Sequence, residues 1–180
     1  MNLALDAVHR FGAMPEDYYL DWTRVAIEER GHFLMLRDRL AAHGGAYGDL
    51  TCHNGLWEIA EKTAHDPGAR MGLVPLVFEA RGLDVTPGLI ERFERHGDHE
   101  SAAVLEVVLR DEIGHVAVGH RWFEYVCEQR GVDPVSEFER LVAAFDLLIV
   151  PPFNDEARVQ AGFRPDDLAR WESSFVGSRQ

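Results

Sequence analysis

Two stretches of the sequence each carry a glutamate and a histidine three residues apart. The pairs are Glu29 with His32 and Glu112 with His115, and in both the residue before the glutamate is acidic and a glycine directly precedes the histidine. Side chains three positions apart lie on the same face of an α-helix. Carboxylate and imidazole ligands together suit iron, manganese or zinc better than calcium or magnesium. The spacing therefore predicts a transition-metal site shared by two helices.

Both pairs interrupt an apolar stripe near the middle of a long helical segment. The stripe of residues 15–43 contains Trp22, Val25, Ala26, Glu29, His32, Phe33, Leu36 and Leu40, and that of residues 99–130 contains Val104, Leu105, Val108, Glu112, His115, Val116, Gly119, Trp122, Phe123 and Val126. Burying an unpaired carboxylate costs on the order of several kcal/mol, so each buried glutamate needs a compensating partner. About one Glu-x-x-His pair is expected by chance in a chain of this composition. The position of the two pairs, rather than their number, favours metal ligation over ion-paired core residues.

A third carboxylate, Glu79, lies on the apolar face of residues 68–82, together with Gly72, Pro75, Leu76 and Leu83. If the next turn lies near Gly97, Glu79 and Glu112 are at similar distances from it, and they should lie at the same depth to within about one helical turn. The alternative is a carboxylate that faces solvent beside Arg81.

The residues directly before the two ligand glutamates, Glu28 and Asp111, are also acidic. A metal-bound imidazole needs an acceptor for its second nitrogen. Glu28 and Asp111 are candidates for that role, and a position on a solvated helix face is the alternative.

Di-iron carboxylate bundles take one glutamate from each of two helices and a Glu-x-x-His pair from each of the other two. The fourth carboxylate should come from the first helix. Reflecting Glu29 through a turn at residues 13–14 places its partner just before Met1, and Asp6 is about one turn too close to that turn. We therefore expect five protein ligands (Glu29, His32, Glu79, Glu112 and His115) for two iron ions, with manganese or zinc as alternatives. One metal ion is expected if the sixth ligand matters.

The elements that must position these residues are all helical. Helical periodicity, glycines and prolines predict helices at residues 2–11, 15–43, 55–65, 68–82, 88–96, 99–130 and 134–149, with two short ones in 153–180 divided by Gly162 and Pro165. Strand signals are almost absent. The pattern predicts one all-α domain over residues 1–180, a four-helix bundle with accessory helices in a C-terminal extension at residues 153–180.

Composition restricts the partners. The formal net charge is −13 and Lys62 is the single lysine, which disfavours nucleic acid as a partner. The sequence shows no signal peptide and no apolar run of the ~20 residues that span a bilayer, so we expect a soluble cytoplasmic protein without a membrane partner. Cys52 and Cys127 are expected to be free thiols, consistent with a reducing compartment.

Several short motifs match a known family. They are Asn2 to Asp6, Met14-Pro15, Glu28-Glu29 with His32-Phe33, Tyr47-Gly48-Asp49, Gly55 to Glu58, Ala69 to Met71, Glu79 to Pro87, Asp111-Glu112 with His115 to Ala117, and Pro152 to Asn154. With these motifs the chain resembles a bacterial ferritin-like family classed as a domain of unknown function. That family is itself similar to the tRNA hydroxylase that acts on methylthio-isopentenyladenosine.

The resemblance implies a non-haem di-iron fold with Glu29, His32, Glu79, Glu112 and His115 as metal ligands. It also implies that the helix-1 glutamate precedes the stretch from Asn2 to Asp6, so we expect the first turns of helix 1 to be missing here.

The leading functional hypothesis is a di-iron oxidoreductase or hydroxylase that acts on an unknown small-molecule substrate. A tRNA base is disfavoured by the charge. The alternative is a non-catalytic, metal-binding or structural bundle with an incomplete site. Iron storage is disfavoured because the residues after Pro152 do not resemble a cage-forming subunit, and a homo-oligomer is compatible with the sequence.

Overall fold

The computed structural model describes residues 1–177, and this part of the chain is helical and contains no strand. The elements are α1 (Asn2–Arg10), α2 (Glu16–Ala42), α3 (Gly55–Lys62), α4 (Pro67–Leu73), the π-helical segment η1 (Val74–Glu79), α5 (Ala80–Arg95), α6 (His99–Arg130), α7 (Pro134–Ala144), α8 (Asp155–Gln160) and α9 (Pro165–Gly177). The prediction of an all-α bundle is confirmed.

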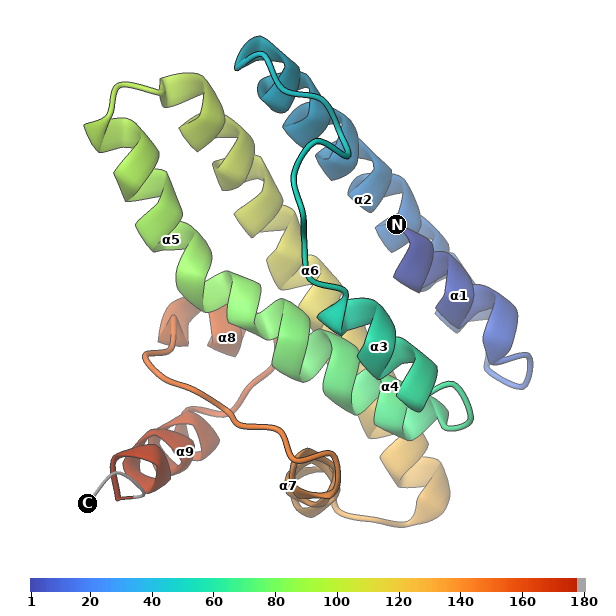
Figure 1. The fold of residues 1–180 in the computed structure, drawn as a ribbon. Coiled ribbons are helices and arrows are strands. Elements are labelled where there is room, and N and C mark those ends of the chain that lie inside the picture. The colour runs from blue at the N-terminus through green and yellow to red at the C-terminus, as the bar shows by residue number, and fades with distance from the viewer. Residues whose placement is uncertain (178–180) are drawn as a thin grey trace.

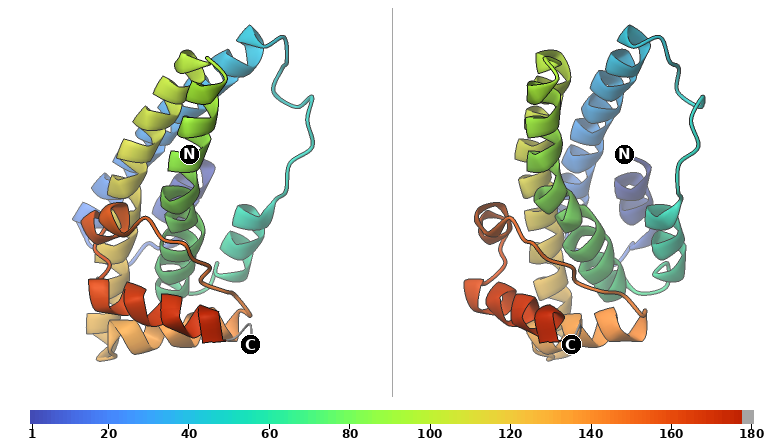
Figure 2. Two further views of the ribbon diagram at one scale, coloured as in Figure 1. Left: turned by 90° about the vertical axis from the view of Figure 1, so that its left-hand side faces the viewer. Right: turned by 60° about the vertical axis from the view of Figure 1, so that its left-hand side comes forward.

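Three long rods form the body of the molecule: α2, the uninterrupted run from α4 through η1 to α5, and α6 (Figure 1). The short helix α1 packs back against the first half of α2, and a long loop descends from the far end of α2 to α3. Helices α7 and α9 lie across the lower end of the rods (Figure 2). No helix within residues 1–177 is both long and apolar enough to cross a membrane.

The core is apolar and reaches from α1 into the C-terminal segment. It includes Tyr18, Trp22, Leu83 and Phe123 from the long rods, and it extends to Phe163 and Leu168 near the start of α9. The C-terminal helices therefore close one end of the bundle.

The predicted stripe of α2 is buried only as far as His32. Phe33 and Leu36, which the sequence pattern placed inside, are exposed. The reason is the position of α1: Met1, the residue that precedes this helix, lies beside Glu29, so α1 covers only the first half of α2.

The predicted break between residues 82 and 88 is wrong, because Gly82 and Pro87 both lie inside α5. Proline lacks a backbone N–H and leaves the carbonyl four residues earlier without its helical donor. Here the Nδ2 amide of Asn154 donates to the Leu83 carbonyl at 3.1 Å and replaces the missing bond. A side chain from 71 residues away thus supports a proline inside the helix.

Helix α7 ends at Ala144, five residues before the predicted end. Asp146 has a left-handed backbone with φ +53°, and the amides of Asp146 and Leu147 donate back to the carbonyls of Ala143 and Val142. This is the Schellman arrangement that normally uses glycine. An aspartate in that position explains why the sequence pattern did not reveal the end.

A buried arginine ties α1, α3 and α4 together. Arg70 pairs with Asp6 at 2.6 Å, donates to Thr63 Oγ1 at 2.9 Å and also donates to the Ala60 carbonyl. Because Asp6 belongs to α1, this network anchors that helix to α3 and α4.

Candidate metal centre

The two Glu-x-x-His pairs meet between α2 and α6. Glu29, His32, Glu112 and His115 each offer a ligand atom, and these atoms all lie within 4.8 Å of one another. His115 Nδ1 is 3.2 Å from Glu29 Oε1 and 3.6 Å from Glu112 Oε2, and His32 Nδ1 is 3.8 Å from Oε1 of both glutamates. Each histidine therefore faces both carboxylates, and the cluster could hold a metal ion.

The second nitrogen of each histidine is held by an acid from the other helix. His32 Nε2 donates to Asp111 Oδ2 at 3.1 Å, and His115 Nε2 donates to Glu28 Oε2 at 2.9 Å. These contacts confirm the interpretation of Glu28 and Asp111 as orienting acceptors. A neutral imidazole that donates its Nε2 proton in this way presents its Nδ1 lone pair to the carboxylates, as a metal ligand must.

Both Nδ1 atoms are buried and have no hydrogen-bond partner. Buried polar atoms are nearly always satisfied, and an exception calls for an explanation such as a bound ion. Two unsatisfied imidazole nitrogens opposite two carboxylates fit a cation that carries ligands from both helices.

The electrostatics of the cluster favour positive charge at its centre. Burial acts to lower the pKa of His115, but the adjacent carboxylates of Glu112, Glu29 and Glu28 outweigh it and raise the pKa to about 10. The pKa of His32 is raised, chiefly by its interaction with Glu29. Burial acts to raise the pKa of Glu29, but its bonds to the two histidines hold it below the ordinary value. A divalent cation would supply the same positive charge directly.

Glu79 lies at the end of η1 and borders the same cavity as Glu29 and Glu112, but it is outside the four-residue cluster. Its Oε2 atom is buried without a hydrogen-bond partner. Burial raises the pKa of Glu79 to about 8, and the charges of Glu112 and Glu29 add to the effect. The structure thus brings the fifth predicted residue near the cluster, and its role as a ligand stays a prediction.

The first helix contributes no carboxylate to the cluster among the described residues. The backbone nitrogen of Met1 lies 3.3 Å from Glu29 Oε2, which agrees with the register expected from the hairpin. Asp6 pairs with Arg10 and Arg70 instead.

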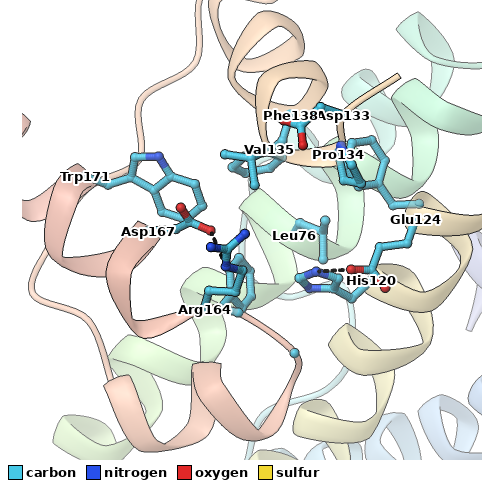
Figure 3. Close-up of a pocket in the computed structure, with 13 residues that line it drawn as sticks. Leu76, His120, Glu124, Asp133, Pro134, Val135, Phe138, Arg164, Asp167 and Trp171 are labelled. Atoms are coloured by element: carbon cyan, nitrogen blue, oxygen red, sulfur yellow. Dashed lines mark ion pairs between the residues drawn. The ribbon is translucent and has the colours of Figure 1, made fainter. Parts of the chain in front are cut away.

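A second cavity, which sequence reasoning did not anticipate, lies at the closed end of the bundle (Figure 3). It has a volume of about 120 Å³ and lies between α6, the start of α7, and α9 with the turn before it. Its ionisable groups have nearby partners: His120 Nε2 is 3.6 Å from Glu124 Oε1, Arg164 Nε is 3.8 Å from Asp167 Oδ2, and Asp133 accepts from Ser136. His120 follows His115 by five positions, which places it on a different face of α6. No short sequence motif marks this cavity, because its walls come from segments far apart in the chain.

Fold and site together define an all-α bundle with a buried glutamate–histidine cluster that could bind a metal ion. The chain belongs to a family of proteins of unknown function, DUF455, which matches residues 1–169. It is 42% identical over 176 residues to an uncharacterized protein of Haemophilus influenzae, with 93% of this chain and 61% of that protein covered. The chain therefore spans about three-fifths of this curated relative's length. No solved structure matches the chain.

Proposed function

We propose that this protein is a ferritin-like metalloprotein that binds two iron ions and acts as an oxygen-activating oxidoreductase or hydroxylase on a small-molecule substrate. The observation that carries the proposal is the pair of buried, unpartnered Nδ1 atoms of His32 and His115, which face two shared carboxylates. A bound cation would give both nitrogens the partner that they lack in hydrogen-bonding geometry.

The four ligand residues are arranged as expected for a site with two ions rather than for a polar network without metal. Glu29 and Glu112 each lie within 3.8 Å of both histidines, which suits carboxylates that bridge two cations. Glu79 would add a terminal carboxylate through its unsatisfied Oε2. Mixed imidazole and carboxylate ligation suits iron, with manganese or zinc as alternatives. Bound iron would supply the electrons for reduction of dioxygen, a capacity that protein side chains lack.

The chain's own residues hold and shield this chemistry. Asp111 and Glu28 fix the tautomer and orientation of the histidines. Trp22 and Val25 are buried on the turns of α2 before Glu29 and form part of the apolar wall of the cavity beside the cluster. A tRNA substrate, which the similarity to the hydroxylase would suggest, is opposed by the net charge of −13.

The test is the metal content per chain after expression in iron-supplemented medium, followed by dioxygen consumption with a chemical reductant. Two irons per chain are expected, and Glu112→Ala should lose them. Glu106→Ala is the matched control because Glu106 is an exposed glutamate on the same helix. Loss of metal in both variants, or metal retained in Glu112→Ala, would contradict the assignment.

A second candidate is a structural site with one ion and no turnover. The four-residue cluster favours it, because four ligand atoms within 4.8 Å suffice for one ion while Glu79 lies outside. One zinc or manganese per chain, with no dioxygen consumption when iron replaces it, would support this function instead.

A further inference from the structure

Beside the cluster lies a cavity of about 290 Å³ that opens between α1, α2, α5 and α6. Its wall toward the cluster is formed by Glu29, Glu79 and Glu112, and the rest is mainly apolar, with Trp22, Phe78 and Val108 among the lining side chains. Thr86 and the indole N–H of Trp22 are the neutral polar side-chain groups among the described residues that line it. The cavity therefore has one ionisable wall, next to the candidate metal ions, and an otherwise apolar body.

The charges of this cavity exclude whole classes of ligand. Its positive charge among the described residues is the amino group of Met1, which is already paired with Glu29 at 3.3 Å. No lysine, arginine or histidine lines it among these residues, whereas phosphates and carboxylates are normally held by such cations. An organic cation would need a carboxylate that remains unpaired. The three carboxylates here are those proposed to bind metal. An organic cation would therefore lose its hydration against an apolar surface, which is strongly unfavourable.

We infer that this cavity is the substrate site and that the substrate is a small, uncharged and largely apolar molecule. This inference rests on the proposed function. An engineered apolar cavity of about 150 Å³ accommodates benzene, so a cavity of about 290 Å³ has room for roughly twelve non-hydrogen atoms. A nucleotide is excluded by both its size and its phosphate.

Gly82 provides a clean test because it lines the cavity and a Cβ added there would meet nothing within 4 Å. We expect the longer side chain of a leucine at this position to fill part of the cavity. Gly88 is the matched control: it lies on the same helix, is exposed, does not line the cavity and also has nothing within 4 Å.

The probes are toluene, benzoate and benzylammonium, which share one ring and differ in charge. Binding to the zinc-loaded protein is measured by ligand-observed NMR, and zinc per chain is measured on the same samples. We expect toluene to bind at least tenfold more tightly than either ion. Gly82→Leu should weaken toluene binding at least tenfold, and Gly88→Leu should leave it unchanged.

The inference is overturned if toluene does not bind, if either ion binds as tightly, or if Gly82→Leu has no effect. The amount of zinc bound per chain distinguishes failure of this inference from failure of the proposed function. If zinc binds but toluene is not preferred, only the substrate class is refuted. If toluene is preferred but the chain binds no metal, the metal site is refuted and the cavity remains as a separate ligand site.

Discussion

At the scale of single residues, the crossed hydrogen bonds give different roles to the two acids in Glu28-Glu29 and in Asp111-Glu112. In each helix the glutamate faces the centre, while the acid before it reaches the histidine of the other helix. Helical spacing predicted the four residues that lie together in the cluster, whereas Glu79, the fifth predicted ligand, lies outside it. The spacing did not reveal that the orienting contacts run between helices, because that depends on how α2 and α6 are rotated against each other.

Removing one orienting acid should weaken metal binding without removing a ligand. We expect Asp111→Ala to lower metal affinity by roughly 10- to 100-fold, because His32 loses the acceptor that holds its ring. Asp111→Asn, which keeps an acceptor oxygen, should lie between wild type and Asp111→Ala. Competition with a chromophoric chelator gives the affinities. Equal affinity in all three proteins would show that Asp111 does not orient His32.

At the scale of elements, helix ends that depend on neighbouring residues could be predicted from the sequence. Helix ends that depend on contacts with distant residues could not. Residues 99–130 form α6 with the predicted bounds, since Asp98 caps the start and Gly131 ends the helix with a left-handed backbone. The break at Gly82 to Pro87 was wrong because Asn154 supports α5 from a distant segment. The second cavity was missed for the same reason.

Close packing between η1 and α6 depends on one glycine. A Cβ on Gly119 would lie 2.2 Å from the Pro75 side chain, whereas one on Gly114, on the same helix, would meet nothing within 4 Å. We expect Gly119→Ala to lower the free energy of unfolding by about 1–3 kcal/mol through overpacking. Gly114→Ala should raise it by about 0.5–1 kcal/mol through helix propensity. Urea unfolding of the metal-free protein measures both, and equal effects of the two substitutions would refute the close contact.

The start of α4 should make stability dependent on pH. Asp66 accepts hydrogen bonds from the Gly68 and Ala69 amides and pairs with Arg130 at 2.7 Å. Burial opposes the charge of Asp66, but Arg130 and the amides outweigh it and lower its pKa. Because the unfolded state then binds the proton more tightly, this stabilisation is complete above the unfolded pKa of about 4 and is lost as the pH falls through the folded pKa.

We therefore expect Asp66→Asn to destabilise the protein at pH 7 by about 1–2 kcal/mol. The difference from wild type should shrink below about pH 4. Denaturant unfolding across pH 3 to 7 provides the measurement. A difference that is constant over this range would show that the charge of Asp66 contributes nothing.

At the scale of the whole molecule, the cluster lies midway along α2 and α6, which are also joined by ion pairs of Arg39 with Asp98 and of Arg121 with Asp21. A ligand that binds only the folded state stabilises it by about 2.7 kcal/mol at a concentration of 100 Kd. We expect zinc or manganese to raise the melting temperature of the wild type and to have no such effect on Glu112→Ala. Calorimetry with and without a chelator measures this, and an equal rise in the variant would place the stabilising ion elsewhere.

The histidine contacts between α2 and α6 join residues 79 and 87 positions apart in the chain. Such distant partners meet only after a large loop has closed, and contacts of this kind form late in folding. Interactions that are absent from the folding transition state slow unfolding rather than speed folding. The chain should therefore fold first and acquire its ion afterwards, and the ion should prolong the lifetime of the native state rather than hasten its formation.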